Sequence, residues 1–379
     1  MYSRTKAIAK KEFKHLLRDK RFLFVIIFLP IFLLVIFGYA VNFDVQNIKL
    51  SVLDKDKSKN SREFINSISS SSYFSVTSYL KSDKEVKDVL DRKKAQAVLV
   101  IPKDFSEKIE KNKETADVQF LIDGVDGNAA TIIKSYIEIG SLKFNRSLQE
   151  RLITKLGQNI NQPLNLEAIF WFNPDLQTTK FLIPGLIAMI LIITAVISVS
   201  LSLVREKEFG TIEQINVSSV HSIELLVGKS LPYILLSLID AVLILLVGYL
   251  VFGVIVKGSY SLLFITSLIY IVASTALGIF ISVIANSQQV AFLLATFSTL
   301  LPSIILSGFI FPIESMPYLI QILTNISPAK FYIVILRSII IKGVGLSSFW
   351  DQLVYLLIFA FLFLTIAVNI YRKKTDTIN

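Results

Sequence analysis

Cysteine is absent from this sequence of 379 residues, and histidine occurs only twice. The missing cysteines exclude disulfide bonds and thiolate metal sites. His15 and His221 have no metal-ligand spacing around them, so we interpret both as surface residues. No phosphate-binding loop of the form G-x-x-x-x-G-K-[ST], G-x-S-x-G elbow or H-E-x-x-H helix occurs. We therefore expect a non-catalytic chain that holds no cofactor and no metal of its own.

Charged residues are also scarce, at 18% of the chain against 53% hydrophobic residues. The mean hydropathy is +0.62, and the apolar residues fall in blocks. A helix needs roughly 20 apolar residues to cross about 30 Å of hydrocarbon. Six stretches are long enough, which predicts a polytopic α-helical membrane protein. The predicted transmembrane helices are 22–43, 180–204, 230–256, 258–284, 290–311 and 350–371.

The net charge of +10 is concentrated beside the first and last spans rather than spread for a nucleic-acid partner. Lysine and arginine crowd residues 4–21 and again 372–374. By the positive-inside rule, both termini and the tail at 372–379 are expected in the cytoplasm. The first apolar run is longer than a signal-peptide core and lacks a clear cleavage site, so we interpret it as an uncleaved anchor. The expected location is the bacterial cytoplasmic (inner) membrane.

Residues 44–179 differ in character from the spans and would lie outside the cell membrane. Short runs rich in β-branched or aromatic residues alternate there with helix-like pieces. This alternation predicts an extracytoplasmic α/β domain with a mainly parallel or mixed sheet, inserted between the first two spans. The strand-like runs are 48–54, 73–80, 95–102 and 116–124, and the helix-like pieces are 61–69, 83–93, 103–111 and 128–157.

Two further segments are too polar to span the membrane. Residues 1–21 predict an amphipathic helix along the cytoplasmic headgroups, with Ala9, Phe13, Leu16 and Leu17 on its apolar face; a simple basic anchor is the alternative. Residues 312–349 are punctuated by proline, which predicts extracytoplasmic or re-entrant short helices in the outer leaflet.

Asp240 is the one acidic residue inside a predicted span, near the middle of the membrane. A carboxylate there costs several kcal/mol unless it is protonated, hydrated or paired. Two interpretations follow: a place on a transport or proton pathway, or a structural hydrogen bond to a neighbouring helix.

The connection at 205–229 is unusually charged for a turn between two spans. Its sequence predicts a helix end near Gly210 and Thr211, followed by a new helix that Ser219 or Ser222 would cap. Side chains on this segment would face a partner in the cytoplasm.

The motifs "REKEFGTIEQINVSS" and "SIELLVGKSLPY" resemble those of ABC-2 type transporter permeases, and the resemblance extends to "FNPDLQTTKFLIPG" and "LSGFIFPIESMP". It implies an exporter subunit for an amphiphilic drug-, lipid- or peptide-like cargo. ATP and Mg²⁺ would bind a separate ATP-binding cassette ATPase subunit, and a second permease chain would complete the pathway. Residues 1–21 would be the family's connecting helix and 205–229 its coupling helix. The implied coupling residues are Arg205, Glu206, Glu208, Gly210, Thr211, Glu213 and Gln214.

Two other functions remain open from the sequence. A secondary transporter would use Asp240 as a proton site, although the inverted repeats expected of that class are not evident. A membrane-anchored sensor or scaffold would use the extracytoplasmic domain to bind a ligand or a periplasmic or extracellular accessory protein.

Overall fold

The computed structural model describes residues 2–40, 47–70, 73–111, 115–125, 127–156, 172, 178–212 and 220–376. The chain divides into two compact units, one formed by Met1–Asn42 with Ile169–Asn379 and the other by Phe43–Ala168. In the first unit, six of the described helices are long and apolar enough to cross a membrane. The protein is therefore a polytopic helical membrane protein.

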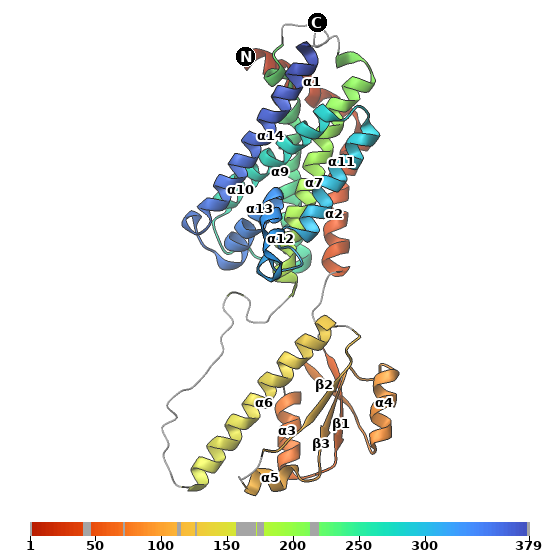
Figure 1. Ribbon diagram of the computed structural model, residues 1–379, viewed down its shortest axis with the longest axis vertical. Helices are drawn as coiled ribbons and strands as arrows, with labels where there is room; N and C mark the ends of the chain where they lie inside the picture. Colours follow the sequence, from red (N-terminus) through yellow and green to blue (C-terminus); the bar gives the residue numbers. More distant parts are fainter. Residues whose placement is uncertain are drawn as a thin grey trace. The chain divides into compact units, whose positions relative to one another are not determined.

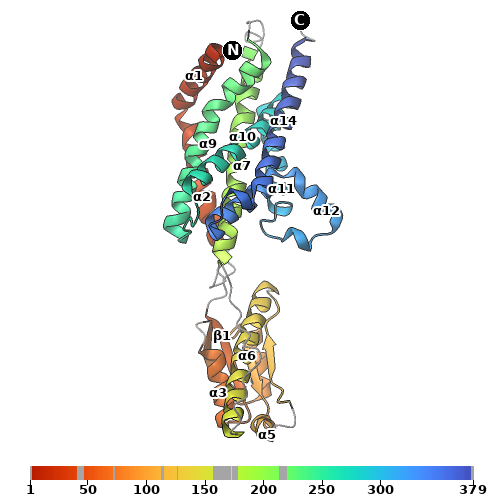
Figure 2. The ribbon, with the colours of Figure 1, turned by 90° about the vertical axis from the view of Figure 1, so that its left-hand side faces the viewer.

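The helical bundle begins with α1, Tyr2–Arg18, which ends one residue before the first long apolar helix. The six membrane-length helices are α2 (Lys20–Ala40), α7 (Thr178–Glu208), α9 (Ser222–Phe252), α10 (Tyr260–Ile284), α11 (Gln288–Ile305) and α14 (Trp350–Asp376). The start of α1 and the end of α14 lie at the same end of the bundle, as an even number of crossings requires (Figure 1). Figure 2 shows α1 beside α9, with which it is in contact.

The core of the bundle is formed by α7 and α10, the two most enclosed of these helices. Gly278 of α10 allows the two backbones to approach closely, because a Cβ atom there would lie 2.9 Å from the carbonyl oxygen of Val196. Small residues permit such close packing between helices in membranes. Tyr270 donates a hydrogen bond to the carbonyl of Ala188 at 2.8 Å and stacks on Tyr332 with ring centroids 4.0 Å apart. These contacts fix α7 as the central helix.

Several helix ends differ from the predicted spans. The predicted fifth span reaches residue 311, but α11 ends at Ile305. The chain turns there through Gly308, which has a φ of 74° that favours glycine. The third membrane-length helix, α9, begins at Ser222 rather than 230, because its first two turns contain the charged residues Glu224 and Lys229 and therefore lie before the uncharged run.

Short helices fill the segment between α11 and α14. They are η1 (Ile313–Ser315), α12 (Tyr318–Leu323), η2 (Thr324–Ile326), α13 (Pro328–Leu336), η3 (Arg337–Lys342) and η4 (Leu346–Ser348). The segments on either side of residue 327 meet at a bend of 89°. Most apolar side chains of α13 are buried in the bundle core, so this part is more enclosed than a surface loop.

The second unit is an α/β unit with a four-stranded mixed sheet in the order β2-β1-β3-β4. The strands are β1 (Ile48–Asp54), β2 (Phe74–Tyr79), β3 (Ala97–Ile101) and β4 (Gln119–Ile122). β1 is parallel to β2 and β3, whereas β4 is antiparallel to β3. The helices are α3 (Lys59–Ser69), α4 (Asp83–Asp91), α5 (Phe105–Lys111) and α6 (Gly127–Leu156).

The helices of this unit cover both faces of the sheet (Figure 1). Phe64 of α3, Phe105 of α5 and Ile133 of α6 share one apolar core. Val86 and Val89 of α4 belong to a separate core on the other face. The strand β3, which is buried on both faces, is accordingly a continuous apolar run.

Candidate functional site

The last turn of α7 carries four consecutive charged residues, and each reaches a different part of the bundle. They are Arg205, Glu206, Lys207 and Glu208. Arg205 lies 3.4 Å from Asp19, at the break between α1 and α2. The other three contact α1, α9, α10 and α11, as set out below. This turn of α7 therefore ties together α1, α9, α10, α11 and the break between α1 and α2.

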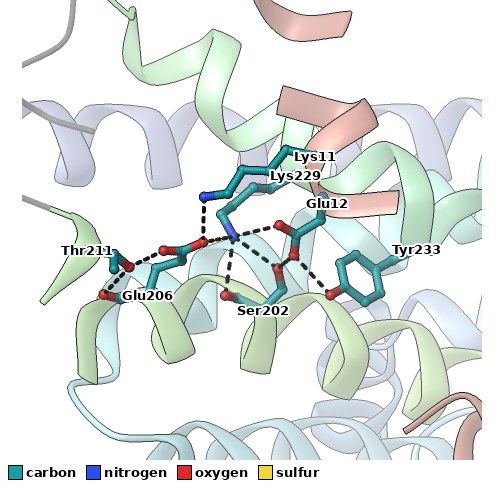
Figure 3. Close-up of polar contacts among 7 residues, drawn as sticks. All are labelled: Lys11, Glu12, Ser202, Glu206, Thr211, Lys229 and Tyr233. Atoms are coloured by element: carbon teal, nitrogen blue, oxygen red, sulfur yellow. Dashed lines mark hydrogen bonds and ion pairs between the residues drawn. The ribbon is translucent and has the colours of Figure 1, made fainter. Parts of the chain in front are cut away.

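Glu206 belongs to a polar network between α1, α7 and α9 (Figure 3). Glu12 of α1 accepts hydrogen bonds from Tyr233 at 3.0 Å, from Ser202, and from Lys229 at 3.1 Å. Lys229 of α9 also lies 3.4 Å from Glu206. The side chains of Lys229 and Glu12 are only 6% and 8% exposed.

Burial makes this network sensitive to the loss of any one member. Taking two opposite charges out of water is costly, and their attraction offsets that cost only when both are present and hydrogen-bonded. Lys11 adds a more exposed ammonium 3.4 Å from Glu206, so the two carboxylates of Glu12 and Glu206 face two cations. The network thus holds α1 firmly against α7 and α9.

The face of α1 that packs against the bundle differs from the predicted apolar face. Glu12 and Leu16 are buried and Ile8 packs with them, as expected for residues four apart on a helix. Phe13 and Leu17 are exposed. One face of α1 therefore packs the buried carboxylate of Glu12 against the bundle, and another face exposes the apolar side chains of Phe13 and Leu17.

Lys207 and Glu208 attach α7 to the turn between α10 and α11. The ammonium of Lys207 donates to the carbonyls of Ser282, Val283 and Ala285 at the end of α10. Glu208 accepts from the backbone and side-chain amides of Gln288, the first residue of α11. A cation at a helix C-terminus and an anion at an N-terminus both complement the helix dipoles.

The chain leaves α7 through an exposed tip. Phe209 is 73% exposed, and Gly210 has a φ of 68° with open space where a Cβ atom would lie. A glycine in this conformation is a common helix terminator. Thr211 turns back and donates a hydrogen bond to Glu206. Glu213 and Gln214, which the sequence also predicts as coupling residues, lie outside the described residues.

The next helix begins at Ser222 with His221 as its N-cap. The backbone amide of His221 donates to the carboxylate of Glu224 at 3.0 Å. The predicted cap at Ser222 is wrong, because this residue is already helical, and Ser219 lies outside the described residues. A pocket of about 430 Å³ opens between α1 and α7, with Glu12, Arg205 and Phe209 in its lining.

Asp240 stands apart from this network. It is 1% exposed in the middle of α9, and neither of its carboxylate oxygens has a hydrogen-bond partner among the described residues. The structural hydrogen bond considered from the sequence is therefore not found in the described part of the chain. The described residues also contain no group of three or more histidine, aspartate or glutamate side chains that could hold a metal ion.

Sequence analysis missed the partners that the coupling residues use. Glu12, Ser202, Lys229 and Tyr233 were not predicted as site residues. A glutamate on a helix rich in lysine, and a lysine at the start of an apolar run, were the available signals. These signals indicate two charges whose burial in the membrane protein requires a partner. Which residues pair cannot be predicted from the sequence, because the partners lie about two hundred positions apart and are brought together only by the fold.

Comparison with known proteins gives a consistent result over the whole chain. The family described as "ABC-2 family transporter protein" matches residues 20–369. The "Probable multidrug ABC transporter permease YbhR" of Escherichia coli K12 is 30% identical over 376 residues, which is 99% of this chain and 100% of the relative. "Probable multidrug ABC transporter permease YbhS" of the same organism is 31% identical, over 90% of this chain and 89% of the relative. "ABC transporter G family member 20" of Dictyostelium discoideum is 24% identical, over 97% of this chain and 50% of the relative.

Proposed function

Because this chain belongs to the ABC-2 family of transporter proteins, we propose that it is the permease subunit of an exporter driven by a separate ATP-binding cassette ATPase. The observation that carries the proposal is the last turn of α7, whose four charged side chains bind to α1, α9, α10, α11 and the α1–α2 break. Force applied at this turn would reach most of the bundle.

In the proposed mechanism, the ATPase binds the end of the bundle that carries α1 and the tip of α7 at Phe209 and Gly210. From the distribution of lysine and arginine we infer that this end faces the cytoplasm and that the α/β unit is extracytoplasmic. ATP binding draws two ATPase subunits together, and the last turn of α7, which is paired with α9 through Glu206 and Lys229, passes the movement to the membrane helices. ATP and Mg²⁺ would be held by the ATPase alone.

The packing assigns one role to three of the predicted coupling residues and points to Phe209, which the sequence analysis did not predict, for another. Arg205, Glu206 and Glu208 contact their own chain, so we assign them to transmission of the movement. Phe209, with its exposed ring, is the side chain best placed to bind the partner. Aromatic residues contribute strongly at protein interfaces when they are buried in a pocket of the partner.

The family supports a proposal for the cargo and for the assembly. The printed names of the two relatives from Escherichia coli describe multidrug permeases, which supports a drug-like or other amphiphilic cargo. Six spans form half of the proposed pathway, so a second permease chain, identical or similar, would complete it in the bacterial inner membrane. An accessory protein outside the membrane would contact the α/β unit.

Co-purification with candidate ATP-binding cassette ATPase subunits tests the docking. Phe209→Ala is expected to reduce the recovered ATPase at least fivefold, an estimate on the order of what interface aromatics contribute. Glu206→Gln should still recover the ATPase but weaken the dependence of its ATP hydrolysis on added cargo, because transmission rather than docking is changed.

Tyr318→Ala is the matched control. Tyr318 is also a highly exposed aromatic residue, but it lies in α12, at the end of the bundle opposite to Phe209. This variant should recover the ATPase as the parent does. If the Phe209→Ala and Tyr318→Ala variants recover equal amounts of ATPase, the tip of α7 is not the docking site.

A further inference from the structure

The α/β unit has a pocket of about 900 Å³ at the carboxyl ends of its parallel strands. The pocket is lined by residues 53, 54, 55 and 57 at the end of β1, by residues 79, 80 and 81 at the end of β2, and by Lys103 after β3, together with residues of α3. The volume falls within the range of small-molecule sites in proteins.

The topology of the sheet marks this place as a binding crevice. From β1 the chain passes through α3 to β2 on one side, and from β2 through α4 to β3 on the other side of β1. α3 and α4 lie on opposite faces, so the connections after β1 and β2 diverge and leave a crevice between the two strand ends. In open α/β sheets, ligands bind at such a switch point.

The pocket is strongly basic. Its charged lining consists of Lys55, Lys57, Arg62, Lys81, Lys103 and the single acid Asp54. The carboxylate of Asp54 is already engaged, since it accepts hydrogen bonds from the hydroxyl of Ser61 at 2.8 Å and from two backbone amides. It therefore shapes the loop after β1 rather than neutralising the pocket.

The basic side chains fall into two groups. Lys55 is paired with Asp83 at 2.6 Å, and the guanidinium of Arg62 donates to the carbonyls of Ser58 and Lys57. The ammonium groups of Lys57, Lys81 and Lys103 have no hydrogen-bond or ion-pair partner among the described residues. Of the nearby acids, Asp104 is paired with Lys108 at 2.8 Å, and Asp56, which is not part of the pocket lining, keeps one buried carboxylate oxygen without a hydrogen-bond partner among the described residues.

The rest of the lining is apolar or aromatic. Leu53, Ile65 and Leu80 belong to the two cores of the unit and form the inner wall. Tyr79, at the end of β2, is 65% exposed and offers a ring beside the lysines. A ligand that matches both parts of this lining has an anionic group and an apolar or aromatic body.

We propose that this pocket binds a small soluble organic anion, such as an aryl phosphate, sulfonate or carboxylate, with Lys57, Lys81 and Lys103 holding the anionic group and Tyr79 contacting the apolar part. The site lies in the α/β unit and is independent of ATP and of the docking proposed above. It gives the α/β unit a receptor function for anionic molecules.

The test is a calorimetric titration of the full chain, in phosphatidylcholine nanodiscs, with 1-naphthyl phosphate. We expect 1-naphthyl phosphate to bind. Neutral 1-naphthol should bind about tenfold more weakly, because hydrogen bonds to charged groups contribute much of the affinity. The variant Lys57→Gln/Lys81→Gln/Lys103→Gln should lose at least tenfold in affinity. Equal binding of the phosphate and the alcohol would overturn the proposal.

A control variant separates recognition from general charge. Lys84→Gln/Lys87→Gln/Lys94→Gln removes the same three charges from α4 and the turn after it, away from the pocket lining. It should bind 1-naphthyl phosphate as the parent does. If it loses affinity as much as the pocket variant, only the net charge of the unit matters and the proposed site is wrong.

Tyr79→Ala and a change of lipid complete the test. Tyr79→Ala should weaken 1-naphthyl phosphate several-fold while leaving weak binding of inorganic phosphate unchanged. In nanodiscs containing phosphatidylglycerol, unchanged affinity supports a soluble anion as ligand. A tenfold loss of affinity there would assign the pocket to a lipid headgroup and overturn the proposal of a soluble ligand.

Discussion

Beside the end of α7, Lys229 is paired with Glu12 and Glu206 inside the bundle, whereas Lys57 and Lys103 of the α/β unit line a pocket and have no side-chain partner among the described residues. Both regions contain many charged side chains, but these side chains have different roles. Paired and buried charges fix helices against one another. Unpaired charges beside a pocket remain available to a ligand. The following predictions test that difference.

The largest effect is expected for Lys229→Met. The change leaves Glu12 as a buried carboxylate without its cation, and breaking a buried pair in this way costs about 3–5 kcal/mol. We expect a marked fall in the thermal unfolding midpoint of the purified chain, and faster amide exchange in α1.

The double variant Glu12→Gln/Lys229→Met provides the control for this prediction. Removing both charges should restore most of the lost stability, because no buried charge is left alone. If the double variant is as unstable as the sum of the two single variants, Glu12 and Lys229 do not act as a pair. The contrast with the α/β pocket would then fail.

Asp240→Asn should act in the opposite direction from Glu12→Gln, although both changes remove a buried acid with little change of shape. Asp240 has no hydrogen-bond partner among the described residues, so removing its charge should not destabilise the chain and is expected to stabilise it by about 1 kcal/mol. Glu12→Gln should destabilise it. Thermal unfolding of the two variants side by side measures the difference.

Transport measurements on the same variant decide the role of Asp240. Export that falls while assembly is intact would place this residue on the pathway, as a functional acid inside a membrane requires. Unchanged export would exclude that role. Destabilisation equal to that of Glu12→Gln would show that Asp240 has a partner and would remove the contrast.

The sequence predicted much of the fold because its signals are local. Apolar runs of about 20 residues mark membrane helices, and the strands β1 to β4 lie inside runs recognised by their β-branched and aromatic residues. The end of α11 was predicted six residues too late, since Ile310 and Phe311 continue the apolar run after the helix has turned at Gly308. Hydropathy alone does not register such a turn.

The candidate site could be predicted only in part. The charged residues 205–208 and the glycine at position 210 marked an unusual connection in the sequence. The sequence did not show which helices these side chains contact. Glu12 and Lys229 are far apart in the sequence, and their pairing depends on how α1 crosses α9. The basic pocket was missed for the same reason, because its lysines follow three different strands and meet only at one edge of the sheet.

The smallest effect on stability is expected for Lys103→Gln. Lys103 is exposed and has no partner among the described residues, so its loss breaks no contact and slightly reduces repulsion between neighbouring lysines. Its effect on stability should lie within about 0.5 kcal/mol, as for most surface changes. Because the chain has two units and global unfolding mixes them, the measurement is hydrogen exchange of the amides of β1 and β3. A loss above 1 kcal/mol would mean that Lys103 holds the fold together as Lys229 does, and that the charges of the pocket are structural rather than free for a ligand.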